Sequence, residues 1–158
     1  MDALTRLVAI EEIRQLKSRY FRTMDTHDLE GMAEVFCKDA VLDVRNVFRY
    51  VPLGGDPVGP TGPVIHGRDN IMDWLGQSLP VTSSAHHGHG HEITIVSETE
   101  AHGVIAMEDV VRRPDCKSPV LHGYGHYYER YAFEDGAWRI AESRLERLLI
   151  DLHTDEFN

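Results

Sequence analysis

Apolar side chains in the first half of the chain recur at helical spacing. Over residues 4–24 they return every three or four positions, as at Leu7 and Ile10, which predicts an amphipathic helix with one buried stripe. The same spacing predicts two shorter helices, over residues 28–36 and 66–79. The first part of the chain is therefore expected to be largely helical.

The pattern changes to strand-like alternation later in the chain. We expect a short strand in KDAVLDV and longer strands from residue 91 onward, in HEITIVSE, HGVIAMEDVVRR, LHGYGHYYERYAFE and AWRIAESRLERLLI. Asp135 and Gly136 are a hairpin turn signal between the last two. Helices followed by a meander of strands predict an α+β fold, in which a curved sheet wraps around the N-terminal helices as a cone-shaped barrel with an interior cavity. We expect residues 1–158 to form a single domain.

One segment fits neither pattern. Residues 52–63, PLGGDPVGPTGP, contain four prolines and four glycines, too many for a regular element. Loops of this length in a compact domain are often functional. We therefore predict that this loop closes over the cavity as a lid.

Composition narrows the class of partner. The 158 residues carry a formal net charge of −10, which argues against a surface for nucleic acid or an anionic membrane. No apolar run is long enough to span a membrane, and the charged N-terminal segment differs from a secretory signal. Cys37 and Cys116 form neither a disulfide framework nor a metal-type pair. These features predict a cytoplasmic protein with a small-molecule partner.

The densest chemical signal is SSAHHGHGHEITI, residues 83–95. On an extended strand His86 shares one face with Gly88 and Gly90, which leave open space for a ligand beside the ring. The opposite face carries His87, His89 and His91. Three imidazoles can bind zinc, but ligands on one strand need a fourth group. The alternatives at this point are a catalytic His86, a structural or solvated cluster, and a metal site; we favour the first and predict no metal.

Four motifs, one of which includes this histidine segment, resemble a known family. They are QLKSRYFRTMD, IHGRDNI, HHGHGHEITIVSETEAHG and YERYAFEDGAWRI. In this order they resemble the SnoaL-like branch of the nuclear-transport-factor-2-like superfamily over almost the whole chain. The likeness is nearest to the bile-acid 7α-dehydratases and more distant to hexachlorocyclohexane dehydrochlorinase and scytalone dehydratase. It implies a mostly antiparallel curved sheet on helices, an interior cavity for small hydrophobic ligands, no cofactor, and a homodimer or homotrimer.

The same resemblance implies a set of site residues. The dehydratases carry a Tyr and an Asp five residues apart at the end of the first helix, which here are Tyr20 and Asp25. Their catalytic His falls on His86, and their Asp in the next strand falls on Asp109. Their Arg in the last strand matches Arg147 by its distance from the Trp. The dehydrochlorinase has its Arg nearer the Trp, where this chain has Ser143.

These residue types suit the removal of water or HX across a carbon–carbon bond. A neutral imidazole takes the proton from carbon, and a buried carboxylate fixes its tautomer, as Asp25 can for His86. Tyr20 can bind or protonate the departing oxygen, and a buried Asp109 can hold a hydroxyl or act as an acid. The leading hypothesis is a lyase of the dehydratase type. The alternatives are an isomerase or dehydrohalogenase with the same dyad, or a non-catalytic binder or structural subunit of a ring-hydroxylating dioxygenase.

Several candidates also have a purely structural interpretation. Asp25 can face solvent, Tyr20 can be a core residue, and only one of the neighbours Glu108 and Asp109 can face inward. Arg147 lies in the charged run ESRLERLL, which is typical of an exposed edge strand or a subunit contact. The remaining candidate substrate contacts are His89 and Tyr124.

Overall fold

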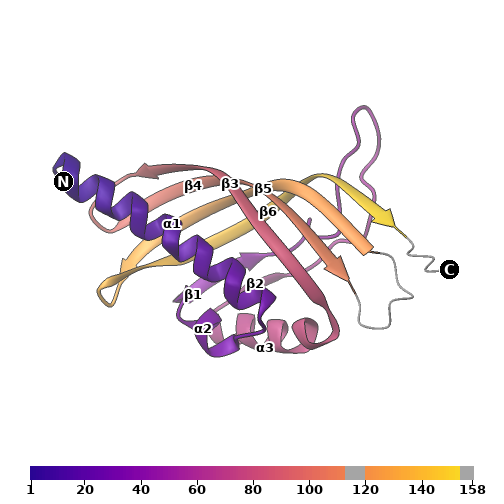
Figure 1. Cartoon of the computed structure of the whole chain (residues 1–158), viewed down its shortest axis with the longest axis horizontal. Coiled ribbons are helices and arrows are strands. Elements are labelled where there is room, and N and C mark those ends of the chain that lie inside the picture. Colours follow the sequence, from indigo (N-terminus) through magenta and orange to yellow (C-terminus); the bar gives the residue numbers. More distant parts are fainter. Residues whose placement is uncertain (113–119, 154–158) are drawn as a thin grey trace.

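The structure, a computed structural model, describes residues 1–112 and 120–153 and combines three α-helices, a short 3-10 helix and one sheet (Figure 1). The helices are α1 (Ala3–Asp25), α2 (Leu29–Ala33) and α3 (Arg68–Ser78), with the 3-10 helix at Leu79–Val81. The strands are β1 (Phe36–Asp43), β2 (Val64–His66), β3 (Ser83–Ile95), β4 (Glu100–Arg112), β5 (Val120–Glu134) and β6 (Ala137–His153).

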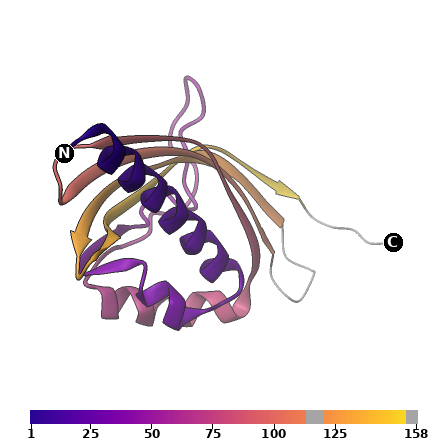
Figure 2. The same cartoon turned by 60° about the vertical axis from the view of Figure 1, so that its left-hand side comes forward.

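The six strands form one open, curved sheet in the order β2-β1-β6-β5-β4-β3. Neighbours pair antiparallel, except that β1 runs parallel to β6. Figure 2 shows the sheet arching over α1, while α2 and α3 lie across the open side of the arch. The α+β cone with helices inside a mostly antiparallel sheet is confirmed.

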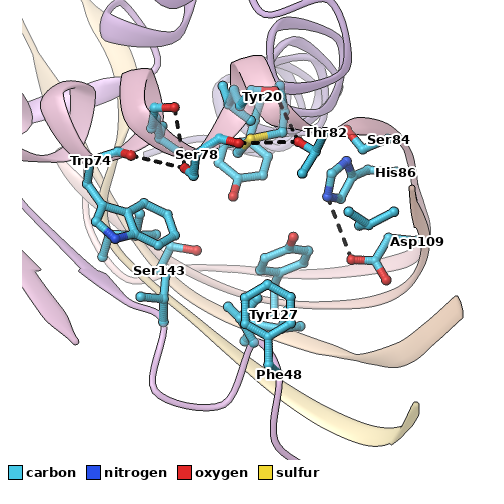
Figure 3. Close-up of a pocket in the computed structure, with 18 of the residues that line it drawn as sticks. Tyr20, Phe48, Trp74, Ser78, Thr82, Ser84, His86, Asp109, Tyr127 and Ser143 are labelled. Carbon is cyan, nitrogen blue, oxygen red and sulfur yellow. Dashed lines mark hydrogen bonds and ion pairs between the residues drawn. The ribbon is translucent and has the colours of Figure 1, made fainter. Parts of the chain in front are cut away.

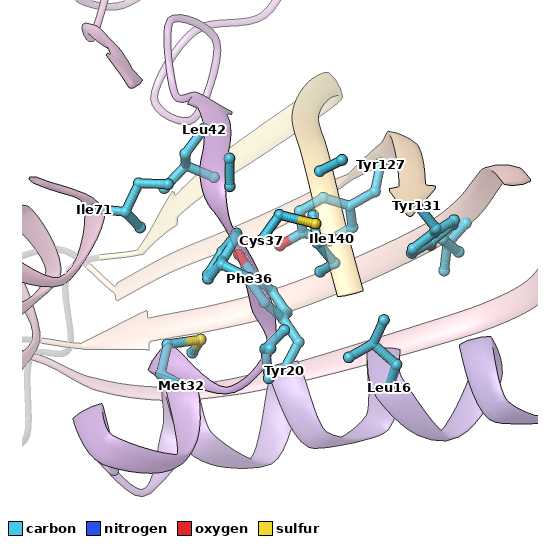
Figure 4. Close-up of a cluster of buried hydrophobic side chains, with 14 of the residues drawn as sticks. Leu16, Tyr20, Met32, Phe36, Cys37, Leu42, Ile71, Tyr127, Tyr131 and Ile140 are labelled. Atoms are coloured by element: carbon cyan, nitrogen blue, oxygen red, sulfur yellow. The ribbon is translucent and has the colours of Figure 1, made fainter. Parts of the chain in front are cut away.

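The core lies between α1 and the concave face of the sheet (Figure 4). The buried stripe of α1 includes Ile13, Leu16 and Tyr20, each at most 4% exposed. Asp2 caps this helix, since its side chain accepts a hydrogen bond from the backbone N–H of Thr5 at 2.8 Å. The predicted first helix is confirmed, and it ends at a residue that the site uses.

The second and third helices are shorter than the ranges predicted from the sequence. Asp28 caps α2 by accepting from the Gly31 N–H at 2.9 Å, but the helix ends at Ala33. Phe36 instead begins β1 and pairs with Ile140 of β6, because burial against the sheet outweighs local helical spacing. The short strand β2, which pairs with β1, was not predicted.

Strand β3 begins at Ser83, not at residue 91, and it contains a bulge that corrects the predicted face pattern. Gly90 has φ +51, and the β3–β4 register shifts between His89 and Glu92. After this extra residue the alternation is reset, so His91 is half-buried while His87 and His89 are exposed. The prediction that His87, His89 and His91 share one face was therefore wrong.

The proline-glycine segment belongs to a projecting hairpin. Tyr50 and Val58 exchange backbone hydrogen bonds of 3.1 and 2.9 Å, and the Gly62 N–H donates to the Arg45 carbonyl at 3.2 Å. Leu53 at the tip is fully exposed. None of residues 52–63 lines the cavity described below; the preceding residues, including Phe48, do.

The predicted hairpin turn is present between the last two strands. Asp135 and Gly136 have φ values of 52 and 78, the left-handed conformation of a tight hairpin turn between β5 and β6. Cys37 is buried, and Cys116 lies outside the described residues. Within the described part of the chain, none of the helices combines the length and apolar character needed to cross a membrane.

Candidate active site

A cavity of about 130 Å³ opens between α1, α3 and the concave face of the sheet (Figure 3). Its wall is mostly apolar, with Met24, Leu42, Phe48, Trp74, Leu79 and Leu145 among the lining residues. Tyr20, Tyr127, His86 and Asp109 form a polar end of the cavity, and Ser143 lies farther along the wall, nearer Trp74 (Figure 3). An apolar hollow with a few convergent polar groups is the usual form of a small-molecule site.

His86 lines this cavity and is held by Asp25 at the end of α1. The His86 Nδ1 lies 2.6 Å from Asp25 Oδ1, and the His86 backbone N–H donates to Asp25 Oδ2 at 2.9 Å. The Ser84 hydroxyl donates to Asp25 Oδ1 at 2.8 Å. With Nδ1–H donating to the carboxylate, Nε2 is left with the lone pair of a neutral imidazole.

The environment of Asp25 keeps it ionised. Burial alone would raise its pKa, but the hydrogen bonds from the His86 ring, the His86 backbone and Ser84 together hold the pKa of Asp25 below its usual value.

Phe21 of α1 stacks on His86, and the angle between the two ring planes is 9°. A Cβ at Gly88 would lie 2.5 Å from the Phe21 ring, so this glycine makes the stacking possible.

An ionic pair lies on the opposite side of the His86 ring. Asp109 is 2% exposed, and both its oxygens accept from Arg147, at 2.6 and 2.7 Å. Arg147 Nε also donates to the Val47 carbonyl at 3.0 Å. Asp109 Oδ2 lies 3.7 Å from His86 Nε2, which is too long for a hydrogen bond (Figure 3). The imidazole is thus placed between two carboxylates, only one of which it contacts directly.

Two tyrosines complete the polar end. The hydroxyls of Tyr20 and Tyr127 point toward one another in the cavity (Figure 3). Burial raises the pKa of Tyr20 far above its usual range, and the charge of Glu129 acts in the same direction. Burial also raises the pKa of Tyr127. Both phenols therefore stay protonated near neutral pH and can act as hydrogen-bond donors.

The sequence matches a known domain family over most of its length. The sequence model of the SnoaL-like domain matches residues 5–144. The chain belongs to the SnoaL-like domain family.

Solved structures support the same SnoaL-like fold. A protein from Novosphingobium aromaticivorans DSM 12444 assigned as a scytalone dehydratase shares 23% identity, with 96% of this chain and 92% of that chain covered and a TM-score of 0.76. A hexachlorocyclohexane dehydrochlorinase from Novosphingobium barchaimii LL02 shares 16% identity over 98% and 96% of the two chains, with a TM-score of 0.78. A protein from Novosphingobium aromaticivorans assigned as an aromatic ring hydroxylase shares 18% identity over 94% and 96%, with a TM-score of 0.76. At these identities the likeness shows the fold.

The SnoaL-like cone brings most of the predicted site residues together. The cavity lining includes Tyr20, His86, Asp109 and Arg147, and Asp25 contacts His86 from just outside it. The interpretation of ESRLERLL as an exposed edge was wrong, because β6 lies between β1 and β5, so alternate residues of this run face inward.

Two predicted substrate contacts lie elsewhere. The His89 side chain is 59% exposed and Tyr124 stacks on His122 on the convex face, so neither lines the cavity. Strand alternation turns both away, since their neighbours on the inner face are Gly88 and Gly123. Among the described residues, no group of three or more His, Cys, Asp or Glu side chains is arranged to hold a metal ion.

Sequence reasoning missed Tyr127, Ser84 and Trp74 as cavity residues. Tyr127 has a visible signal, because it shares one face of β5 with Gly123 and Gly125, but the sequence does not decide which face of that strand lines a pocket. Trp74 follows the helical spacing of apolar residues in the segment 66–79, which predicts burial but not a cavity. Which core aromatic borders a hollow depends on packing between elements, which local spacing does not encode.

Proposed function

We propose that this SnoaL-like protein is a cofactor-independent lyase that eliminates water or another leaving group from a small hydrophobic substrate. The observation that carries the proposal is the His86 ring, which Asp25 holds at 2.6 Å beside an apolar cavity. A neutral imidazole with its free nitrogen toward a dry site is well suited to take a weakly acidic proton from carbon. The dehydratase and dehydrochlorinase names of similar folds support this reaction class.

The reaction proceeds by proton transfer to His86 Nε2. The C–H electron pair forms the new double bond while the bond to the leaving hydroxyl breaks. The hydroxyl takes the proton back from the imidazolium and departs as water, which regenerates the base. Asp25 stabilises the imidazolium through Nδ1–H, and the nearby Asp109 adds a second negative charge 3.7 Å from Nε2.

The remaining groups orient the substrate oxygen. Tyr20 and Tyr127 stay neutral and donate hydrogen bonds to a carbonyl, enolate or leaving oxygen. Arg147 binds both oxygens of Asp109, which stabilises that residue as a carboxylate, so we assign Asp109 as an anion and not as the acid. Because two phenols can hold an enolate, isomerisation by proton transfer uses the same geometry.

The test compares two adjacent histidines on opposite faces of β3. Purified wild-type protein is assayed on hydroxy-aromatic, hydroxy-steroid and halogenated compounds, for elimination products and for deuterium exchange from D₂O into recovered substrate. We expect His86→Ala to lower turnover about 10²–10⁴-fold, the range for loss of a general base. His87→Ala is the matched control, because this side chain is 58% exposed and points away from the cavity.

The outcomes separate the candidate functions. Elimination products that disappear in His86→Ala support the lyase. Deuterium exchange without elimination supports an isomerase. No reaction on any compound, together with unchanged ligand binding in His86→Ala, overturns the enzyme proposal in favour of a binding protein.

A further inference from the structure

A buried ion pair lies directly behind the polar end of the cavity, and the reaction above does not use it. Lys17 on α1 and Glu129 on β5 are separated by 112 residues in sequence, and Lys17 Nζ lies 2.6 Å from Glu129 Oε1. Both side chains are 0% exposed. Neither residue lines the cavity.

The ammonium group of Lys17 contacts the two cavity phenols through their ring faces. Its Nζ lies 3.4 Å from the ring centroid of Tyr127 and 3.9 Å from that of Tyr20. An ammonium has three N–H donors, and Glu129 accounts for one of them. The Phe21 ring is farther away, with its centroid 4.9 Å from Nζ, so the two tyrosine rings are the nearest aromatic contacts of this charge. Lys17, Tyr20 and Tyr127 are all buried, and cation–π attraction is stronger where the charge is desolvated.

Glu129 extends the same network to the rest of the wall. Its carboxylate accepts from Lys17, from the Ser143 hydroxyl at 2.8 Å and from the Tyr131 hydroxyl. Ser143 also lines the cavity. Three residues of the polar wall, Tyr20, Tyr127 and Ser143, are thus in contact with one ion pair.

Burial of such a pair is costly for the fold. Burial lowers the pKa of Lys17, and the charge of Glu129 opposes that change. Buried pairs are often no better for stability than apolar residues of the same shape, although removing one partner alone is strongly destabilising. Stability alone therefore gives little reason for a charge at this place.

We propose that the Lys17–Glu129 pair is a positioning device that fixes the Tyr20 and Tyr127 hydroxyls for the substrate oxygen. The charge holds both rings by their faces, so that their hydroxyls converge in the cavity, and it withdraws electron density from the rings, which strengthens the hydroxyls as donors. Lys17 and Glu129 act through the tyrosines and do not touch the substrate. This inference rests on the proposed function, since it assigns the pair a part in the same reaction.

The test replaces the pair without leaving a lone buried charge. The double variant Lys17→Met/Glu129→Gln keeps similar side-chain shapes. The Gln carbonyl can accept from one of the Ser143 and Tyr131 hydroxyls, and the Gln amide can donate to the other. We expect the double variant to fold with a melting temperature near that of the wild type, whereas Lys17→Met alone is strongly destabilised. In the double variant we expect kcat to fall about tenfold and KM to change less than about threefold, the size of one or two cation–π contacts.

A second readout does not require turnover. Tyrosine labelled at ¹³Cζ is measured by NMR, with Tyr20 and Tyr127 assigned through their Phe variants. Of the six tyrosines, we expect Tyr20 and Tyr127 to shift in the double variant and their rings to flip faster. Tyr131 also shifts, because its hydrogen-bond acceptor Glu129 is replaced. Tyr50, which pairs with Val58 in the projecting hairpin and does not line the cavity, is the internal reference.

The matched control is an exposed pair on β5 and β6, the strands that carry Glu129 and Ser143. Arg130 and Glu142 follow Glu129 and precede Ser143, and their side chains are 39% and 55% exposed. Arg130→Met/Glu142→Gln should change neither kcat nor the two tyrosine resonances.

Each result decides the proposal. A lower kcat together with shifted Tyr20 and Tyr127 resonances supports it, and unchanged kcat or unmoved resonances in a folded double variant overturns it. If the double variant does not fold, the resonances are compared in the wild type across the titration of Lys17, where unmoved signals also overturn the proposal. Absence of wild-type turnover contradicts the proposed function and leaves the NMR result to decide whether the pair positions the phenols.

Discussion

At the residue scale, the two ring nitrogens of His86 have different surroundings. Asp25 contacts Nδ1 at 2.6 Å and also accepts the His86 backbone N–H, so ring and strand are fixed by one carboxylate. Nε2 has Asp109 at 3.7 Å and the cavity beside it. In the proposed reaction, this arrangement orients the base before any substrate is bound, which lowers the cost of reorganisation.

Asp25→Asn should keep the shape of the site but reverse the tautomer of His86. The Asn amide can donate to Nδ1, which would place the ring proton on Nε2 and remove the base. We expect turnover to fall about 10³–10⁴-fold with ligand affinity nearly unchanged, as for other His–Asp pairs. Steady-state kinetics and ligand titration measure the two effects, and a variant that retains more than a tenth of wild-type turnover would contradict the assignment.

Asp25 should also make the stability of the fold depend on pH. Its pKa is held below the usual value by hydrogen bonds from His86 and Ser84, so the unfolded chain binds a proton more readily than the folded chain. The contribution is therefore present above the unfolded pKa of about 3.9 and is lost as pH falls through the folded value. Urea unfolding from pH 7 to pH 3 should show the stability difference between wild type and Asp25→Asn shrinking below about pH 4. A stability difference that grows toward acid pH would contradict the predicted direction of this pH dependence.

Gly123 makes room for the Asp109–Arg147 pair. A Cβ at this position would lie 2.1 Å from Arg147 Nη1 and 2.7 Å from Asp109 Oδ1. Gly123→Ala should therefore displace a buried, bidentate pair and lower the free energy of unfolding by about 3 kcal/mol. Gly76→Ala in α3 is the control, because its Cβ would meet Leu29 at an ordinary 3.5 Å. That helical substitution should stabilise by about 0.5–1 kcal/mol in the same urea experiment.

At the element scale, the bulge in β3 decides which residues face the core. Gly90 and His91 together oppose Ile105, between the pairs His89–Ala106 and Glu92–Val104. The extra residue lets His86 and Ile95 both face inward although they are an odd number of positions apart. A strict alternation assigns them to opposite faces, which is why the sequence-based pattern failed beyond Gly90.

Deleting Gly90 should be tolerated, because all the remaining side chains of β3 stay on their present faces when the extra residue is removed. We expect the free energy of unfolding to change by less than roughly 1 kcal/mol, with activity retained. Deleting Thr94 is the matched control. It makes Ile93 and Ile95 adjacent, so one of them must leave the core at a cost of about 1.5–3 kcal/mol. Equal effects of the two deletions in urea unfolding would show that the bulge does not set the register.

At the scale of the whole molecule, the cavity limits the substrate. Its volume of about 130 Å³ is close to that of an engineered cavity of roughly 150 Å³ that binds benzene. We therefore propose a one-ring substrate that carries a hydroxyl or carbonyl for the tyrosines.

Homodimer or homotrimer formation stays a prediction, to be measured by light scattering.

One-ring ligands should stabilise the fold more than polycyclic ones. At a concentration about 100 times its Kd, a ligand that binds only the folded state adds ~2.7 kcal/mol, which raises the melting temperature. We expect phenols or cyclohexanols to give this shift and a hydroxy-steroid to give little. Val111→Phe, which adds a ring at the cavity wall, should abolish the shift without loss of the fold. A larger shift with the steroid would reject the one-ring class.

The sequence by itself determined what depends on short-range spacing. The helical stripe of α1, the strands of the second half and the Asp135–Gly136 turn follow from periodicity and turn chemistry. Motif order, through the family resemblance, identified the position of His86 and its partner Asp25, and the structure brings them to 2.6 Å. Local patterns succeed here because backbone geometry repeats over a few residues.

Only the tertiary structure decided which side chains meet across the molecule. Arg147 faces Asp109 because β6 lies inside the sheet, although its charged run is typical of an edge. Lys17 meets Glu129 across 112 residues because α1 crosses the concave face. Strand order and helix docking result from burial summed over the whole core, and no local window of sequence contains that sum.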